Sequence, residues 1–384
     1  MNFFSSDFKL GILGGGQLGK MLLTETRRLD IHTLVIDPSN EAPCRIGSNE
    51  FYEGDLNDYN TVYNFGKSTD VLTFEIEHVN TDALEQLERE GVKVYPQPAM
   101  LRIIKNKADQ KDFYIKNDIP TAGFKRFGSI VLLKEALTTE VVEMPFVWKS
   151  AEGGYDGNGV KVVRTMADLE SLPNVECIAE TMVPFKNELA VIVARNPSGE
   201  VRAYPVVEME FHPEANQVEY VICPARIEDS VAEKATAIAL QVSEAFRHVG
   251  LLAVEMFQTE EDEILVNEVA PRPHNSGHYS IEASYTSQFE QHLRAILDLP
   301  LGSTESKAAG IMVNLVGAEG YSGNVVYENI DDILKLDGVT PHIYGKKQTR
   351  PFRKMGHVTI VNEDIAEARK IAEQVKNTIR VISN

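Results

Sequence analysis

Two neighbouring apolar runs, each carrying one carboxylate, constrain this chain more than any other stretch. The first reads Leu-Ala-Val-Glu-Met-Phe and contains Glu255, and the second reads Val-Asn-Glu-Val-Ala and contains Glu268. Acidic residues at 260–262 lie between them and are typical of a turn, so the runs predict two paired β-strands. Because Mg²⁺ favours carboxylate and phosphate oxygens, two carboxylates on paired strands predict a metal–nucleotide site.

The residues around the second carboxylate add groups that bind anions. Asn267 precedes Glu268, and Arg272, His274 and His278 follow within ten positions. Arginine forms paired hydrogen bonds with planar anions, and imidazole N–H groups can donate to them as well. This segment therefore predicts an anion-binding arm beside the metal–nucleotide site.

The composition favours a cytoplasmic enzyme with small ligands. The 384 residues suffice for two or three domains, and 38 basic against 57 acidic side chains give a net charge of −19. That charge argues against nucleic acid or an anionic membrane as the main partner, but not against phosphorylated small molecules. No run reaches the roughly 18–20 apolar residues of a membrane span, and we expect no signal peptide. The three separated cysteines fit no zinc or redox spacing and predict buried thiols.

Strands that alternate with helices dominate the first part of the chain. Residues 9–19 predict a short strand that runs into a glycine turn, after which leucines repeat at helical spacing. Strands are predicted at 33–36 and 71–74. This alternation indicates a parallel sheet with right-handed crossovers, in a domain that ends near residue 104.

A pattern richer in strands follows a lysine-rich helix predicted at 105–117, whose Lys105 and Lys111 we expect in solvent. An amphipathic helix is predicted at 231–249. The final part of the chain predicts a small separate domain that contains a basic loop at 345–356 and ends in a helix. Further strands are predicted at 145–149, 160–164, 177–180, 188–194, 204–209, 220–224, 310–316 and 357–361.

The first glycine loop, at 14–19, fits several kinds of phosphate site. It satisfies G-x-G-x-x-G after a strand, and Asp37 lies at a distance suited to a ribose contact, which favours a dinucleotide. It also nearly fits a P-loop, but Met21 stands where Ser or Thr should hold magnesium. Any phosphate can bind the amides of a helix N-terminus, and a tight turn without a ligand is the remaining interpretation.

The second glycine loop, at 153–159, has four glycines in seven residues between two predicted strands. Such a hairpin can close over phosphates, with Tyr155 and Asp156 at its tip and Lys149 on the preceding strand as a point charge. The alternative is a mobile surface hairpin. Similar alternatives remain open for the residues that could hold the nucleotide base and ribose, because each alone can be structural; these are Glu180 to Val183, Glu188, Lys107 and His212.

In this order, the features resemble the ATP-grasp superfamily, and five motifs are similar to the N5-carboxyaminoimidazole ribonucleotide synthetases of purine biosynthesis. The motifs are Gly-Gly-Gly-Gln-Leu-Gly at 14–19, Thr-Phe-Glu-Ile-Glu-His-Val at 73–79, Gly-Gly-Tyr-Asp-Gly-x-Gly at 153–159, Asn-Glu-Val-Ala-Pro-Arg-Pro-His-Asn-Ser-Gly-His at 267–278 and Arg-Pro-x-Arg-Lys-Met-Gly-His at 350–357. One departure is Lys107, since the family often has arginine there.

The resemblance implies a mixed α/β and α+β architecture in three parts. These are an N-terminal parallel-sheet domain at 1–104, a central ATP-grasp domain at 105–298 with a lid subdomain at about 125–182, and a small β-rich C-terminal domain at 299–384. It also implies a homodimer, and a reaction in which ATP, bicarbonate and aminoimidazole ribonucleotide give the carbamate, ADP and phosphate through carboxyphosphate.

The resemblance further assigns roles to individual residues. Glu255 and Glu268 would hold Mg²⁺ or Mn²⁺, and Asp156, Arg272 and His274 would act in catalysis. The implied ATP contacts are Lys107, Lys149, Gly153, Gly154, Tyr155, Asp156, Gly157, Asn158, Gly159, Glu180, Met182, Val183, Glu188, His212, Asn267 and Glu268. The implied ribonucleotide and bicarbonate contacts are Gly16, Gln17, Leu18, Glu75, Tyr155, Asp156, Arg272, His274, Asn275, Lys347, Arg350, Arg353 and Lys354.

Three rival functions can be tested against this one. An NAD-dependent oxidoreductase would use the loop at 14–19 but leaves the second glycine loop and the carboxylate pair without a role. Another ATP-grasp ligase, such as a formate-using glycinamide ribonucleotide transformylase, would use the same basic loop for its substrate phosphate. A regulatory module would bind ATP without turnover.

Overall fold

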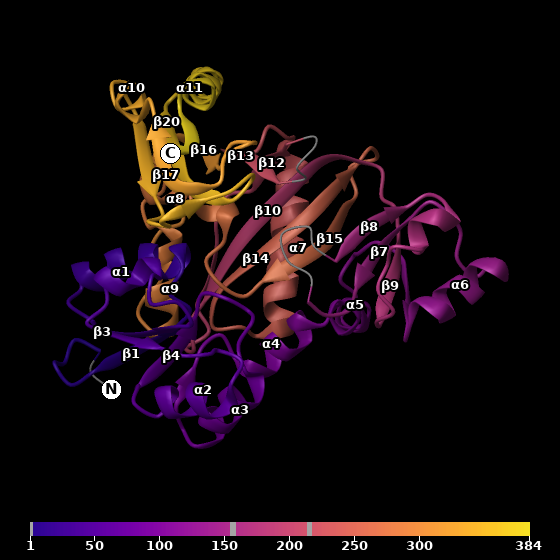
Figure 1. Ribbon diagram of the computed structural model, residues 1–384, viewed down its shortest axis with the longest axis horizontal. Helices are drawn as coiled ribbons and strands as arrows, with labels where there is room; N and C mark the ends of the chain where they lie inside the picture. The colour runs from indigo at the N-terminus through magenta and orange to yellow at the C-terminus, as the bar shows by residue number, and fades with distance from the viewer. Residues whose placement is uncertain (1–2, 154–158, 213–216) are drawn as a thin grey trace.

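The computed structural model describes residues 3–153, 159–212 and 217–384. Its N-terminal part is a five-stranded parallel sheet in the order β3-β2-β1-β4-β5, which confirms the predicted parallel sheet. Helices cover both of its faces (Figure 1). The elements are β1 (Lys9–Leu13), α1 (Gln17–Arg28), β2 (His32–Asp37), η1 (Pro43–Ile46), β3 (Glu50–Glu53), α2 (Tyr59–Gly66), β4 (Val71–Phe74), α3 (Thr81–Arg89) and β5 (Lys93–Val94).

The lysine-rich helix predicted at 105–117 is α5 (Lys107–Lys116), and a separate helix, α4 (Pro98–Lys105), precedes it. The break falls at Asn106, whose side chain accepts hydrogen bonds from the backbone N–H groups of Ala108 and Asp109 and so caps α5. The new helix axis leads the chain from the N-terminal sheet into the lid.

The lid is a four-stranded antiparallel sheet in the order β6-β9-β7-β8. Its apolar face packs on α6 around Trp148 and Phe146. The lid elements are β6 (Phe124–Phe127), α6 (Ile130–Thr138), β7 (Phe146–Ser150), β8 (Val160–Val163), η2 (Met166–Leu169) and β9 (Cys177–Thr181).

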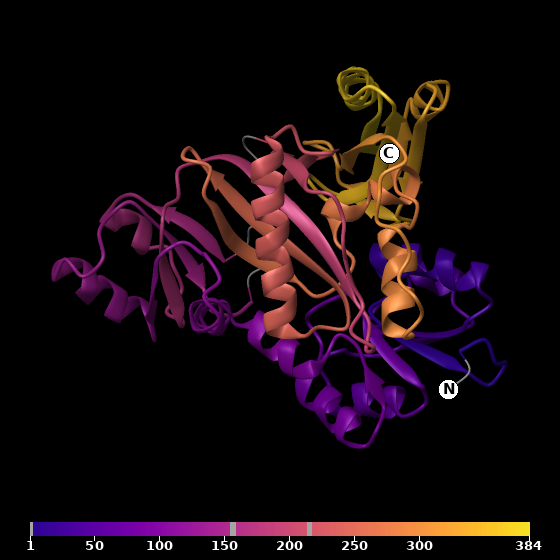
Figure 2. The same cartoon turned by 180° about the vertical axis from the view of Figure 1, so that it is seen from behind.

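The largest sheet has nine strands, and eight of them follow one another in the order β15-β14-β10-β12-β13-β16-β20-β18, with β11 beside β10. The amphipathic helix α7 (Asp229–Phe246) packs Val231 and Ala235 against β10 and β14 and lies across the back of this sheet (Figure 2). The strands are β10 (Phe185–Arg195), β11 (Val201–Ala203), β12 (Val207–Phe211), β13 (Val218–Cys223), β14 (Gly250–Thr259), β15 (Ile264–Ala270), β16 (Ala309–Val316), β18 (Val339–Ile343) and β20 (Lys354–Asn362).

Two features of this sheet differ from the sequence expectation. The strand predicted at 204–209 begins only at Val207, because Pro205 has no N–H to donate to a neighbouring strand. The C-terminal strands also continue the central sheet, since β13 pairs with β16, so the sheet crosses the boundary expected near residue 299.

The remaining elements are η3 (Asn275–Gly277), α8 (Ser280–Ala283), α9 (Gln288–Ile296), β17 (Gly323–Glu328), α10 (Ile330–Ile333), β19 (Gln348–Thr349), α11 (Ile365–Thr378) and β21 (Arg380–Ser383).

Helix α9 fastens the central sheet to the N-terminal sheet. Its Phe289 and Leu293 pack into the apolar core around β1, although they lie about 280 positions further along the chain. On the same helix, buried His292 accepts the Leu251 N–H at Nδ1 (3.3 Å), and its Nε2 lies 3.0 Å from the Thr73 hydroxyl on β4. None of the helices within the described ranges has the length and apolar character that crossing a membrane requires.

Acid should weaken the fold through buried, uncharged histidines. Burial lowers the pKa of His248 to about 4 and the pKa of His292 to about 3. An unfolded histidine titrates near pH 6.5, so below that pH the unfolded chain binds protons that the folded chain does not. We expect the stability contribution of these groups to be complete above pH 6.5 and to be lost as the pH falls, by about 1.4 kcal/mol per pH unit for each histidine.

Urea unfolding at several pH values between 7 and 4 measures this loss. His292→Gln should reduce the slope of unfolding free energy against pH, whereas the same change at the partly exposed His32 is the control. Equal slopes for the wild type and His292→Gln would contradict the prediction.

Candidate active site

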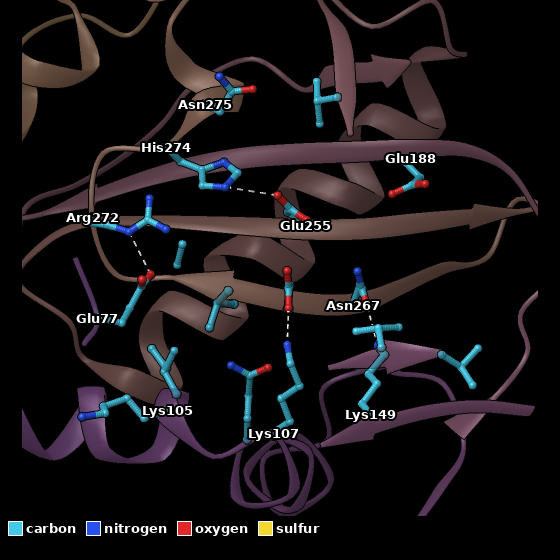
Figure 3. A pocket seen from close by; sticks show the side chains of 18 of the residues that line it. Glu77, Lys105, Lys107, Lys149, Glu188, Glu255, Asn267, Arg272, His274 and Asn275 are labelled. Atoms are coloured by element: carbon cyan, nitrogen blue, oxygen red, sulfur yellow. Dashed lines mark hydrogen bonds and ion pairs between the residues drawn. The ribbon is translucent and has the colours of Figure 1, made fainter. Parts of the chain in front are cut away.

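A cleft of about 1510 Å³ lies where the lid, the central sheet and the ends of the N-terminal strands meet (Figure 3). It brings together residues that the sequence places up to 337 positions apart, from Gln17 to Lys354. The predicted site residues that line it are Gln17, Leu18, Glu75, Lys107, Lys149, Gly153, Glu180, Met182, Val183, Glu188, Glu255, Asn267, Glu268, Arg272, His274, Asn275 and Lys354.

The carboxylate pair lies on the floor of this cleft. Glu255 on β14 and Glu268 on β15 are direct partners across the antiparallel pair, which confirms the predicted pairing of the two strands. Lys107 Nζ lies 2.6 Å from Glu268 Oε2, and its positive charge holds the pKa of Glu268 below the ordinary range. The pKa of Glu255 is raised instead, because burial and the charges of Glu268 and Glu188 all disfavour its ionised form.

A third carboxylate, Glu188 on β10, faces the same space (Figure 3). Burial, with the nearby charge of Glu268, raises its pKa to about 7. Because mutual repulsion disfavours ionisation of this cluster, the donor set fits a bound divalent cation. Within the described part of the chain, no group of three or more His, Cys, Asp or Glu side chains is arranged as a metal site of its own. The pair would therefore need oxygen ligands from elsewhere, such as phosphates.

Lysines of the lid and of α5 surround the nucleotide side of the cleft. Lys149 Nζ donates to Asn267 Oδ1 (3.0 Å) and lies 2.8 Å from Glu180 Oε1, so it bridges the lid and the central sheet (Figure 3). The expectation of solvated lysines is wrong for Lys111, which is 2% exposed and paired with Glu180. It is also wrong in part for half-buried Lys105, which donates to the Val79 carbonyl because α4 packs there.

An apolar wall stands beside Met182 and Val183, at the end of β9. Phe185 and Phe257 stack with ring centroids 4.6 Å apart, and both line the cleft. Flat aromatic and aliphatic surfaces of this kind suit a nucleotide base. Sequence reasoning missed both phenylalanines, because only the pairing of β10 with β14 brings them together.

The anion-binding arm follows β15 and faces the other end of the cleft. Arg272 Nε donates to Glu77 Oε1 (2.8 Å), which ties the arm to the end of β4 (Figure 3). His274 Nδ1 accepts the Ser276 N–H, and its Nε2 lies 3.3 Å from Glu255 Oε1. The arm and the carboxylate pair are thus in direct contact, as their closeness in sequence suggested.

Two further residues of the arm are held by side chains of other elements, Asn314 on β16 and Gln288 on α9. Asn275 exchanges amide hydrogen bonds with Asn314 on β16, both at 3.0 Å. His278 is fully buried, and burial together with neighbouring cations and imidazoles keeps its pKa well below the ordinary range. Its Nδ1 lies 2.9 Å from the amide nitrogen of Gln288.

The amides of the first glycine loop are occupied by side chains of the protein itself. Glu75, which the sequence predicts as a substrate contact, accepts hydrogen bonds from the N–H groups of Gly16 (2.7 Å), Leu18 (3.1 Å) and Gly19 (3.2 Å). Asp37 accepts the Gly15 N–H (2.8 Å). A carboxylate therefore takes the position at the start of α1 that a dinucleotide phosphate would need, which disfavours the dinucleotide interpretation.

The basic loop lies beside α1 but is only partly directed at the cleft. Lys20 Nζ donates to the Ile343 carbonyl (2.7 Å) and anchors the base of the loop to α1. Lys354 lines the cleft, whereas Lys347 pairs with Glu41 (2.6 Å) and Arg353 donates to the Gln348 carbonyl. Gly16, Gly159, His212, Lys347, Arg350 and Arg353 are outside the cleft lining, and residues 154–158 of the second glycine loop lie outside the described residues.

Three families of known domains match consecutive parts of the chain. Residues 8–105 match the ribonucleotide synthetase preATP-grasp domain, and residues 112–289 match the ATP-grasp domain. Residues 310–371 match the phosphoribosylaminoimidazole carboxylase C-terminal domain.

Relatives extend this similarity over nearly the full chain. N5-carboxyaminoimidazole ribonucleotide synthase from Bacillus subtilis is 38% identical over 92% of this chain and 91% of its own length. The crystal structure of the synthetase from Thermotoga maritima is 42% identical, with a TM-score of 0.90 over 98% of this chain and all of that one. The synthase from Aspergillus clavatus, solved with ADP and 5-aminoimidazole ribonucleotide, is 34% identical, with a TM-score of 0.88 over 97% and 98% of the two chains. The chain therefore belongs to the N5-carboxyaminoimidazole ribonucleotide synthetase family of ATP-grasp enzymes.

Proposed function

We propose that this protein carboxylates the amine of 5-aminoimidazole ribonucleotide with ATP and bicarbonate in de novo purine synthesis. The products are N5-carboxyaminoimidazole ribonucleotide, ADP and phosphate. The observation that carries the proposal is the contact between the two halves of the cleft, where His274 of the anion-binding arm reaches Glu255 of the carboxylate pair. A phosphate-activated intermediate formed at one half can meet its nucleophile at the other without crossing solvent.

The first step forms carboxyphosphate. A bicarbonate oxygen attacks the γ-phosphorus of ATP, the bond from that phosphorus to the bridging oxygen breaks, and ADP leaves with the electron pair. Lys107 and Lys149, which both line the cleft, would neutralise the triphosphate, and charge neutralisation is the main demand of phosphoryl transfer. The Phe185–Phe257 wall supports a site for the adenine base.

The residues of the carboxylate pair fit Mg²⁺, with Mn²⁺ as an alternative. Glu255 and Glu268 would hold the ion, assisted by Asn267. When bound, the ion supplies charge neutralisation to the phosphate oxygens.

The second step transfers the carboxyl group. The amine of the ribonucleotide attacks the carboxyl carbon, phosphate leaves, and the nitrogen loses one proton. Arg272, oriented by Glu77, would hold the carboxylate and stabilise its developing charge. His274 and Asp156 are our candidates for the proton acceptor. When His274 Nδ1 accepts the Ser276 N–H, Nε2 carries the ring proton, so acceptance at Nε2 requires the other tautomer, whose Nδ1 proton points to the Ser276 hydroxyl oxygen 2.9 Å away.

Removing a basic side chain from the loop should weaken ribonucleotide binding. We expect Lys347→Ala or Arg353→Ala to raise the Michaelis constant for the ribonucleotide about tenfold, because each removes a charged hydrogen bond worth roughly 1.5–3 kcal/mol, partly screened at an exposed position. Lys335→Ala, another exposed lysine of the C-terminal part, is the control. If neither change raises this constant in steady-state assays, the loop does not grip the phosphate.

The central experiment is ADP release with each substrate omitted in turn. Release that needs both the ribonucleotide and bicarbonate supports the proposal, and release that needs formate and glycinamide ribonucleotide instead would favour the other ligase. We also propose a cytoplasmic homodimer, with domains at 1–104, 105–298 and 299–384 and the lid at about 125–182. Light scattering of the purified protein tests the dimer.

A further inference from the structure

A chain of buried polar contacts runs behind the nucleotide side of the cleft. Lys111 Nζ on α5 lies 2.5 Å from Glu180 Oε2 on β9, and Glu180 Oε1 lies 2.8 Å from Lys149 Nζ on β7. Lys149 Nζ then donates to Asn267 Oδ1 on β15 (3.0 Å). Four elements from the lid, the linking helix and the central sheet are therefore joined through side chains.

Thr121 connects the first member of this chain of contacts, Lys111, with the strand that carries the last, Asn267. Lys111 Nζ also donates to Thr121 Oγ1 (2.5 Å), and that hydroxyl donates to the Val266 carbonyl (2.7 Å). Val266 directly precedes Asn267 on β15, so the contacts close into a ring. A closed ring restrains Lys149 relative to the carboxylate strand more than any one of its contacts can alone.

The charged side chains of the ring are buried, and two of them are cationic whereas one is anionic. Lys111, Glu180 and Lys149 are 2%, 3% and 7% exposed. Although burial lowers the pKa of Lys111, it remains about 8, so two ammonium groups share one carboxylate at neutral pH. One positive charge is therefore left over, and Lys149, which lines the cleft, is the member placed to present it.

We propose that Lys111 is a positioning residue of the ATP site, which neutralises Glu180 so that the charge of Lys149 stays available to the phosphates of the nucleotide. The inference rests on the proposed use of ATP in this cleft. Lys111 itself is on the far side of Glu180 and is absent from the cleft lining, so it acts through its neighbours. Without Lys111, Glu180 would have Lys149 as its remaining ammonium partner in the ring, and the ring would present no net charge.

Charge-changing variants test this arrangement. Lys111→Met keeps the length of the side chain but removes its charge, and we expect about tenfold weaker ATP binding, with the Michaelis constant for the ribonucleotide changed less than twofold. Lys111→Arg keeps the charge and should restore most of the affinity. Lys116→Met removes an exposed lysine from the same helix and is the control for overall charge.

The double variant Lys111→Met with Glu180→Gln gives the sharpest test. It removes one positive and one negative charge, which leaves the leftover charge of the ring as it is in the wild type. We expect it to bind ATP more tightly than Lys111→Met alone, although it has lost two polar groups. A role of Lys111 in packing alone predicts the opposite order.

Isothermal titration calorimetry measures ATP binding directly and needs no turnover. It therefore separates this inference from the proposed reaction. ATP affinity of Lys111→Met within twofold of the wild type, or no recovery in the double variant, would overturn the role of Lys111. Urea unfolding of each variant establishes that a loss of affinity belongs to folded protein. A wild type that binds ATP but releases no ADP with the ribonucleotide and bicarbonate would instead overturn the proposed function and leave the role of Lys111 intact.

Discussion

Glu268→Gln should lower ADP formation by about a thousandfold or more, equivalent to roughly 4 kcal/mol of transition-state stabilisation. Glu268 faces Glu255 across β14 and β15 and lies 2.6 Å from Lys107. The amide of glutamine carries no charge, so it would remove one anionic ligand from the proposed cation and leave Lys107 without its carboxylate. Steady-state ADP release at saturating Mg²⁺ and ATP measures the effect.

Glu261→Gln provides a matched control for this change. Glu261 is exposed in the turn between the same two strands, so the chemical change is identical but lies away from the cleft. Its activity should stay within twofold of the wild type. Normal turnover in folded Glu268→Gln protein would exclude the carboxylate pair as the metal site.

Arg272→Lys should lower kcat about a hundredfold while the Michaelis constant for ATP stays nearly unchanged. The guanidinium donates to Glu77 at 2.8 Å and to the Pro273 carbonyl at 3.2 Å, and its planar set of donors suits a planar carboxyl group. A lysine keeps the charge but loses the planar arrangement of donors and the anchor, so the loss should concern positioning rather than affinity.

Glu77→Gln should change the same constants in the same direction but less, because the guanidinium remains and only its orientation is relaxed. Arg202→Lys, on the exposed edge strand β11, is the control. If Arg272→Lys raises the Michaelis constant for ATP and spares kcat, then Arg272 acts on the nucleotide and not on the transferred group.

Local sequence patterns predicted the elements whose cores are built from near neighbours. The strand at Val71–Phe74 and the helix near the end of the chain agree with the prediction, because a short apolar run and a period-3.6 repeat can both be recognised from neighbouring residues. The pairing of the two carboxylate strands was also accessible, since a short acidic turn joins two apolar runs. A β-bulge between Glu255 and Met256 then sets Glu268, rather than Asn267, opposite Glu255. The cleft residues followed mostly from resemblance of motifs, not from periodicity.

Contacts between distant segments escaped that reasoning. A lysine on a lysine-rich helix is usually exposed to solvent. Lys111 is instead buried, because its ammonium group pairs with Glu180 on β9 and donates to Thr121. Glu75 lies in a motif that suggested a substrate contact, but the packing of β4 beside β1 aims its carboxylate at the amides of α1. In both cases the partner could not be chosen from spacing.

By itself, the sequence determined the parallel N-terminal sheet, the hairpin that carries two carboxylates and the family to which the chain belongs, because each depends on short-range patterns or on motifs that can be read in order. Only the tertiary structure decided which charges neutralise one another. The Lys111–Glu180–Lys149 ring, the Glu77–Arg272 pair and the Lys107–Glu268 pair each join different elements. Electrostatic interactions depend on distance and burial, and folding sets both by bringing residues remote in sequence together.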